Sequence, residues 1–148
     1  MLRLGIVGAA AALALAEGFT FVIGSPVAAQ DFQVKSAAFV LRTEGCAYPA
    51  KVQVTGTAEG LVKGARRSLT LRVMAAARPG VYAVFQNWPP EGQWVANLKG
   101  TCGGATAGAI VPIGPKGFMR ESSRFLGRPA TDAEIEAALK AMSEGGGK

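Results

Sequence analysis

The chain has 148 residues, a formal net charge of +6 and no histidine. Without histidine, the usual general base and the usual metal ligand are both missing, which excludes Ser-His-Asp and Cys-His arrangements within this chain. The sequence also lacks a phosphate-binding Gly-Lys-Ser/Thr loop, a dinucleotide-binding glycine pattern and an evident pair of carboxylates. Nothing in it points to Ser-Lys or carboxylate-only catalysis. We therefore expect a protein that is not an enzyme and has no cofactor.

The net positive charge indicates which kinds of partner the protein could bind. A modest positive charge favours anionic surfaces or partners. For an exported protein these are lipid head groups, acidic polysaccharides or acidic proteins rather than nucleic acid. Ordinary solubility accounts for the same charge and is the preferred interpretation.

The first residues have the layout of a secretory signal peptide. A positive start, Met1–Arg3, precedes an uninterrupted run of glycine and apolar residues, Gly5–Ala16, and then a second apolar patch, Phe19–Ile23. Small residues at the −3 and −1 positions place the expected cleavage after Ala29. Glu17 argues against this interpretation, because a charge is costly inside an apolar segment.

The alternative for this segment is an uncleaved membrane anchor. Neither apolar piece reaches the roughly 20 residues that are needed to span a bilayer. We therefore expect removal of residues 1–29, export to the periplasm or the extracellular space, and a mature chain without a transmembrane span.

The two cysteines, Cys46 and Cys102, are expected to form a disulfide. In an exported chain an even number of cysteines indicates such a bridge, which here closes a loop of 57 residues counting both ends. A metal-binding or redox pair is the alternative. It is less well supported, because the spacing is not C-x-x-C and no histidine can complete a site.

Short segments of alternating apolar and polar residues, separated by glycines and prolines, are typical of half-buried strands. Residues 32–43 form a longer extended region, either two short strands or one with a bulge. Turns are expected at 63–65 and 78–80. The further expected strands are 51–59, 68–75, 81–86, 93–99 and 106–113. Pro112 and Gly114-Pro115 are expected to end the last of them. With nothing helical between the strands, the pattern predicts an antiparallel β-sandwich rather than a parallel βαβ fold.

The C-terminal residues predict an amphipathic helix. Thr131 and Glu134 have the spacing of a capping box, in which each side chain bonds to the backbone N–H of the other residue. An apolar stripe follows at helical spacing, and Gly145-Gly146-Gly147 ends it. The stripe is formed by Ile135, Ala138, Leu139 and Met142. We expect it to pack on the edge of the sandwich. Docking to a partner is the alternative.

A basic segment precedes this helix. Its cationic residues recur every four positions and would form one stripe on a helix, with Phe118, Met119, Phe125 and Leu126 lying off the stripe. Gly127 and Pro129 would end such a helix. The cationic residues are Lys116, Arg120, Arg124 and Arg128. Arginine recognises carboxylates and phosphates well, so they are candidates for binding an acidic partner or a lipid surface. The preferred interpretation is a solvated face with local pairing to Glu121.

Trp88 is a further candidate for partner binding. It lies beside Pro89-Pro90 in an expected loop, and tryptophan is enriched at interface hot spots. It can equally cap the open end of the sandwich, and we slightly favour that structural role.

Two aromatic motifs carry a resemblance to a known family. Gly80-Val81-Tyr82 and Gly92-Gln93-Trp94 flank the same loop, and the pattern over Ala50 to Leu98 resembles the small exported immunoglobulin-like domains of the YtkA-like and CopC-like group. The resemblance implies an immunoglobulin-like fold and a role in copper handling with His and Met ligands. This sequence has no histidine, and its mature methionines are far apart, so no ligand residue is assigned. Those methionines are Met74, Met119 and Met142.

Together these patterns predict an antiparallel immunoglobulin-like β-sandwich with a C-terminal helical extension. We expect a signal peptide over 1–29, the sandwich over 30–114, and the basic segment with the amphipathic helix over 115–148. The expected function is that of a non-catalytic exported binding or accessory domain of the cell envelope, acting through protein–protein contacts. The alternative is a periplasmic copper-handling accessory domain, which the absence of histidine weakens.

Overall fold

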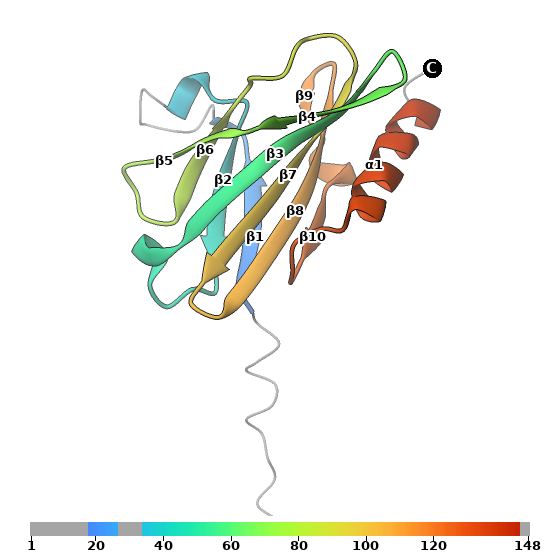
Figure 1. Cartoon of the computed structure of the whole chain (residues 1–148). Coiled ribbons are helices and arrows are strands. Elements are labelled where there is room, and N and C mark those ends of the chain that lie inside the picture. Colours follow the sequence, from blue (N-terminus) through green and yellow to red (C-terminus); the bar gives the residue numbers. More distant parts are fainter. Residues whose placement is uncertain (1–17, 27–33, 146–148) are drawn as a thin grey trace, which may run out of the picture.

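The structure, a computed structural model, describes residues 18–26 and 34–145 of the chain (Figure 1). This part of the chain contains ten β-strands and one α-helix. The strands are β1 (Thr20–Gly24), β2 (Phe39–Glu44), β3 (Gln53–Val62), β4 (Ala65–Thr70), β5 (Arg72–Ala75), β6 (Val81–Phe85), β7 (Gln93–Cys102), β8 (Ala105–Gly114), β9 (Gly117–Phe118) and β10 (Arg124–Leu126). The helix is α1 (Asp132–Gly145), and short 3-10 helices lie at η3 (Val34–Ser36), η4 (Pro49–Lys51) and η5 (Arg120–Ser122). The protein is therefore mainly β, as the sequence predicts.

The described strands form two antiparallel sheets. The smaller sheet has the order β1-β2-β6-β5, and the larger has the order β10-β8-β7-β3-β4 with β9 also paired to β8. In the larger sheet, β3, β7 and β8 run next to one another over most of their length. The two sheets leave β1 and β10 as the end strands on one side of the molecule.

The main hydrophobic core lies between the sheets. From the smaller sheet, β2 contributes Phe39 and Leu41, and from the larger sheet β7 contributes Trp94, Ala96 and Leu98. Successive side chains of a strand point to opposite faces, so these alternating residues all reach the same interior. The period-two pattern of residues 93–99 therefore identifies the inner face of β7 correctly.

One predicted strand is divided between the sheets. The expected segment 68–75 is split at Leu71, so that β4 pairs with β3 in the larger sheet and β5 pairs with β6 in the smaller one. The N–H of Leu71 donates to the carbonyl of Gly56 at 2.9 Å, and the Leu71 side chain is buried in the core. Alternation continues through this corner, which is why the sequence pattern does not reveal it.

The local turn predictions are largely confirmed. Lys63 and Gly64, with φ of 51° and 77°, connect β3 to β4 as a two-residue hairpin turn. Gly80 has φ of 81° and precedes β6. Pro112 does not end β8 but lies inside it, and its carbonyl accepts a hydrogen bond from the N–H of Met119 at 2.8 Å. Proline is tolerated there because the ladder on that side is interrupted between β9 and β10.

Helix α1 covers the outer face of the larger sheet (Figure 1). Ile135 and Leu139, which are 5% and 1% exposed, pack with Val95 of β7 and Ile110 of β8. The apolar stripe that the sequence predicts is therefore covered by the protein's own sheet. The helix lies on the face of the sheet rather than at an edge of the sandwich.

The folded unit extends beyond the expected range of 30–114 in both directions. On the N-terminal side, Thr20–Gly24 forms β1, although it lies within the segment assigned to the signal peptide. On the C-terminal side, β9 and β10 add to the larger sheet. Residues 1–17 and the expected cleavage point after Ala29 lie outside the described residues.

Candidate functional site

The two cysteines are joined as the sequence predicts. Cys46 follows β2 in the smaller sheet, Cys102 ends β7 in the larger sheet, and the two form a disulfide with a Cα–Cα distance of 5.9 Å. The bridge therefore connects the two sheets at one end of the molecule. Its position between structural elements agrees with a structural role.

Trp88 does not form an exposed anchor. The side chain is 6% exposed and belongs to the main core. Its backbone carbonyl accepts a hydrogen bond from Gln86 Nε2 at 3.2 Å. Because a side chain buried to this degree cannot present its ring to a partner without rearrangement, the structure agrees with the capping role rather than the binding role.

The basic segment does not form the α-helix on which its cationic residues would make one stripe. Residues 117–126 instead form β9, η5 and β10. Gly117 has φ of 115°, a left-handed value at which it supports a turn into β9, and Phe118 pairs with Ile113 of β8. The four-residue spacing of the basic residues is therefore not a helical stripe.

The four basic candidates have different surroundings in the structure. Arg120 Nη2 donates to the backbone carbonyl of Ile23 in β1 at 2.9 Å. Arg124 and Arg128 both pair with Glu134 of α1, at 3.3 Å and 2.6 Å. Lys116 is exposed and has no ion pair with any residue in the described part of the chain. Three of the four therefore hold segments of the protein together.

Glu134 links the capping box to the basic segment. Its N–H donates to Thr131 Oγ1 at 3.2 Å, and its Oε1 accepts from the N–H of Thr131 at 3.0 Å, which confirms the predicted capping box. The hydrogen bond from Arg128 and the backbone hydrogen bond from Thr131 lower the pKa of Glu134 from 4.5 to about 2. A carboxylate held in this way stays charged at neutral pH and anchors the start of α1.

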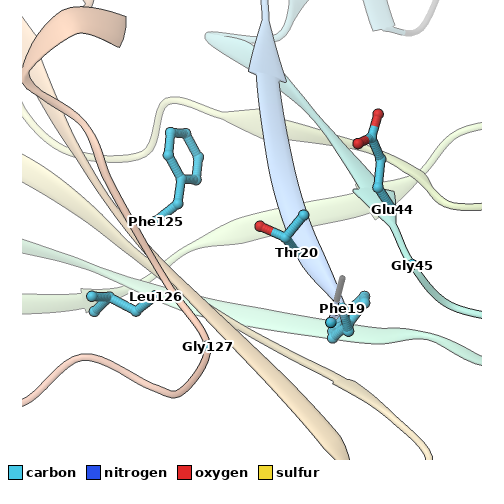
Figure 2. A pocket seen from close by; sticks show the side chains of 8 residues that line it. Phe19, Thr20, Glu44, Gly45, Phe125, Leu126 and Gly127 are labelled. Atoms are coloured by element: carbon cyan, nitrogen blue, oxygen red, sulfur yellow. The ribbon is translucent and has the colours of Figure 1, made fainter. Parts of the chain in front are cut away.

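A hollow on the described surface lies between the two end strands. This edge groove, of about 580 Å³, is lined by residues 18–20 and 44–45 on the side of the smaller sheet and by residues 125–127 on the side of the larger. Figure 2 shows Thr20 of β1 and Phe125 of β10 on opposite sides of it. The groove is thus the opening between the two sheets on the side where β1 and β10 are their edge strands.

Phe125 provides an apolar surface at this groove. It pairs with Ala109 of β8, whose side chain lies in the main core, so Phe125 projects from the same face of the larger sheet. The Phe125 side chain is nevertheless 40% exposed. An aromatic ring on the inner face of a sheet remains exposed only where the opposite sheet does not cover it, and here the end strands leave that opening.

The backbone of β1 provides polar groups on the same side. Arg120 reaches the carbonyl of Ile23 from outside the smaller sheet, so this carbonyl faces away from β2. Alternate residues of an antiparallel strand direct their N–H and C=O groups to the same side, which places those of Phe21 and Phe19 toward the open edge. Arg120 therefore occupies the far end of the edge, whereas the end that lines the groove has no strand neighbour among the described strands.

The sequence analysis missed this groove because β1 was assigned to the signal peptide. Phe19, Phe21 and Ile23 alternate with Thr20 and Val22, which is the same period-two signal that identified the other strands. Phe125 was assigned to the apolar face of a helix. Its exposure depends on the opening between two sheets and has no local sequence signature.

Two other classes of site find no support in the described residues. No group of three or more His, Cys, Asp or Glu side chains within residues 18–26 and 34–145 is placed to hold a metal ion. No α-helix of that same part is long and apolar enough to cross a membrane.

Comparison with protein-family models, with curated proteins and with solved structures finds no match to this chain. The resemblance to the YtkA-like and CopC-like group therefore stays a prediction from two aromatic motifs. In the structure, Tyr82 and Trp94 of these motifs lie in β6 and β7, which belong to different sheets. Tyr82 donates from its hydroxyl to the carbonyl of Val52 at 2.8 Å, and Trp94 Nε1 donates to the carbonyl of Glu91 at 2.9 Å.

Proposed function

We propose that this protein is a non-catalytic exported binding or accessory domain of the cell envelope that acts through protein–protein contacts. We further propose that an extended segment of the partner binds at the edge groove. The observation that carries the proposal is the opening between β1 and β10. There the exposed Phe125 lies beside β1, whose outer edge is paired with no other described strand.

The chemistry of the groove favours an extended peptide. In strand addition, main-chain hydrogen bonds to a sheet edge supply affinity, and alternate side chains of the peptide enter pockets that supply specificity. The outward-facing backbone groups of β1 can form the main-chain hydrogen bonds. Phe125 and Leu126 provide an apolar surface for the side chains of the peptide. Sheet edges that are not used for binding are usually blocked by charge or by covering segments. Arg120 blocks β1 in this way only at the end near Ile23.

Export is supported by the disulfide between Cys46 and Cys102, because such bonds form and persist in oxidising compartments. The positive net charge of the chain favours a partner that carries acidic groups. An anionic lipid surface has less support, since Arg120, Arg124 and Arg128 are engaged within the protein.

We also propose that the two sheets form an immunoglobulin-like sandwich. The support is the face-to-face packing of two antiparallel sheets and a disulfide that connects them. The division of one extended segment between the sheets at Leu71 agrees with such a double-layered β fold.

Site-specific photocrosslinking in intact cells tests the binding site. A benzophenone-bearing residue replaces Phe125, and in a matched control it replaces Met74, an apolar residue of similar exposure on β5 at the opposite edge of the smaller sheet. We expect a discrete crosslinked product from position 125 and none from position 74. Equal products from both positions, or none from 125, would refute the proposed site.

A second variant ties the product to the strand edge. Thr20→Lys places a charge beside the groove, and charged side chains hinder strand addition. We expect the product from position 125 to fall at least tenfold in this background, while the Cys46–Cys102 disulfide still forms. A product that persists unchanged would mean that Phe125 contacts its neighbour without strand addition at β1.

A further inference from the structure

The position of β1 bears on where the chain is processed. β1 pairs with β2 at five register positions, from Thr20 opposite Glu44 to Gly24 opposite Val40. Phe19, Phe21 and Ile23 are only 3–4% exposed and belong to the main core. The segment is therefore an edge strand of the smaller sheet whose side chains form part of the main core.

β1 also contacts residues of the larger sheet. The ring of Phe21 fills the space beside Gly100 of β7, where a Cβ atom would collide with Phe21 Cζ. The rings of Phe19 and Phe21 pack edge to face with centroids 5.6 Å apart. Arg120 donates to the carbonyl of Ile23 from beyond β9. These contacts join β1 to both sheets.

Cleavage after Ala29 would remove all of these groups from the mature protein. Three large apolar side chains would leave the core. The free energy gained by burying them is a large part of the free energy of unfolding of a typical domain. The inner faces of β2 and β7 would then be exposed to water. A mature chain that begins at Gln30 is therefore inconsistent with this fold.

The sequence contains a second suitable cleavage point, in residues that lie outside the described part of the chain. Arg3 precedes the apolar run Gly5–Ala16, whose 12 residues lie within the usual 7–15 of a signal-peptide core. The run ends in Ala14-Leu15-Ala16, which places alanine at both the −3 and −1 positions. Glu17, which is unfavourable inside a leader that ends at Ala29, then lies outside the apolar segment.

We propose that this chain is processed between Ala16 and Glu17, so that β1 becomes the N-terminal strand of the mature domain. Water hydrolyses the Ala16–Glu17 peptide bond, leaving the carboxylate on Ala16 and the amino group on Glu17. The catalyst is an envelope peptidase that accepts small side chains at −3 and −1. The inference rests on the export that the proposed function assumes and is independent of the partner.

Intact-mass measurement and N-terminal sequencing test the proposal. The full chain with a C-terminal tag is produced in a bacterium and recovered from the periplasm under non-reducing conditions. We expect an N-terminus at Glu17 in nearly all of the recovered protein. An N-terminus at Gln30 overturns the proposal and removes β1, and with it the proposed edge groove, while leaving export intact. Recovery of the tagged chain only in the cytoplasm and beginning at Met1 overturns the proposal and export together.

Two matched variants identify the cleavage site independently of the final fold. Ala16→Phe places a large residue at the −1 position of the proposed site, and Ala29→Phe does the same at the alternative site. We expect Ala16→Phe to reduce the processed fraction in a short pulse-labelling experiment at least tenfold and Ala29→Phe to leave it unchanged. The opposite pattern, or equal processing of both variants, overturns the proposal.

Discussion

The ring of Phe21 in β1 occupies the space that a side chain at Gly100 in β7 would need. The two residues belong to different sheets and are separated by most of the length of the domain. Their packing shows why a glycine stands in an otherwise continuous strand of the larger sheet. It also shows that the N-terminal strand is part of the core.

Substitution of Gly100 tests this relationship. Gly100→Ala forces the new methyl group against Phe21, and overpacking of this kind costs about 1–3 kcal/mol. We expect a corresponding fall in the free energy of unfolding measured by urea denaturation. Gly104→Ala is the control, because no heavy atom lies within 4 Å of its Cβ position. Equal stability of the two variants would show that β1 does not pack there.

Loss of the disulfide should lower stability without changing the fold. Replacing both Cys46 and Cys102 by alanine releases a loop closed across 56 positions of the sequence, and the chain-entropy model gives such a crosslink up to about 4 kcal/mol. Urea denaturation of this variant and of the oxidised parent measures the difference. Reduction of the parent protein should reproduce the loss, and a smaller loss on reduction would point to residual crosslinking.

Arg66 is expected to stabilise the packing of α1 through a network of carboxylates. Arg66 Nη2 lies 3.0 Å from Glu59 Oε1 and 3.1 Å from Asp132 Oδ1, and Nη1 lies 3.6 Å from Glu136 Oε1. Glu59 is only 8% exposed, so Arg66→Met leaves a largely buried carboxylate without its cation. We expect a loss of about 1–3 kcal/mol in the free energy of unfolding.

The double variant Arg66→Met with Glu59→Gln is the test of that cause. It removes the buried charge together with its partner, so the loss should be smaller than for Arg66→Met alone. A double variant that is less stable than either single variant would contradict the explanation.

Leu139 should contribute strongly to the docking of α1. Its side chain is 1% exposed and packs with Val95 and Ile110. Leu139→Ala leaves a cavity under the helix and should cost about 2–5 kcal/mol in thermal or urea unfolding. The exposed neighbour Lys140 is the control, and Lys140→Ala should change stability by no more than about 0.5 kcal/mol.

The charge on Glu134 predicts a pH dependence. The pKa of Glu134 is lowered from 4.5 to about 2 in the folded protein, first by the hydrogen bond from Arg128 and then by the backbone N–H of Thr131. The folded state therefore binds the proton less readily than the unfolded state. Stability from this group is fully present above pH 4.5 and is lost as the pH falls through about 2.

Unfolding measured at intervals between pH 5 and pH 2 checks this expectation. Glu134→Gln should be less stable than the parent at pH 5, and the difference should shrink toward pH 2. Glu144→Gln is the control, because Glu144 is exposed on the same helix and forms no ion pair with a described residue. A constant difference over the range would contradict the role of the Glu134 charge.

Local patterns in the sequence predicted several features correctly. The turn at Lys63-Gly64, the strand at 81–86 and the capping box of α1 depend on neighbouring residues, and the structure contains all three. The disulfide was predicted from the number of cysteines and the expected compartment. These signals are strong because backbone conformation, alternation and capping are determined within a few residues.

Other features were not evident in the sequence because one local pattern is compatible with several tertiary arrangements. Apolar residues Phe19–Ile23 suit both a leader and a buried strand, and in the structure Thr20–Gly24 pairs with β2 while Phe19 and Phe21 pack on β7. A basic residue at every fourth position suits a helix. Pairing of Phe118 with Ile113, and of Phe125 with Ala109, instead makes this segment part of the larger sheet.

The sequence by itself therefore determined that this protein is mainly β, that its two cysteines pair, that a capped amphipathic helix follows the strands, and that histidine-dependent chemistry is absent. Only the tertiary structure decided that β1 belongs to the core, that Trp88 is buried, and that Arg120, Arg124 and Arg128 hold segments together. It also placed β1 beside β10 and left Phe125 exposed between them. The physical reason is that alternation and capping are local properties, whereas burial, sheet order and an open edge depend on contacts between residues far apart in the chain.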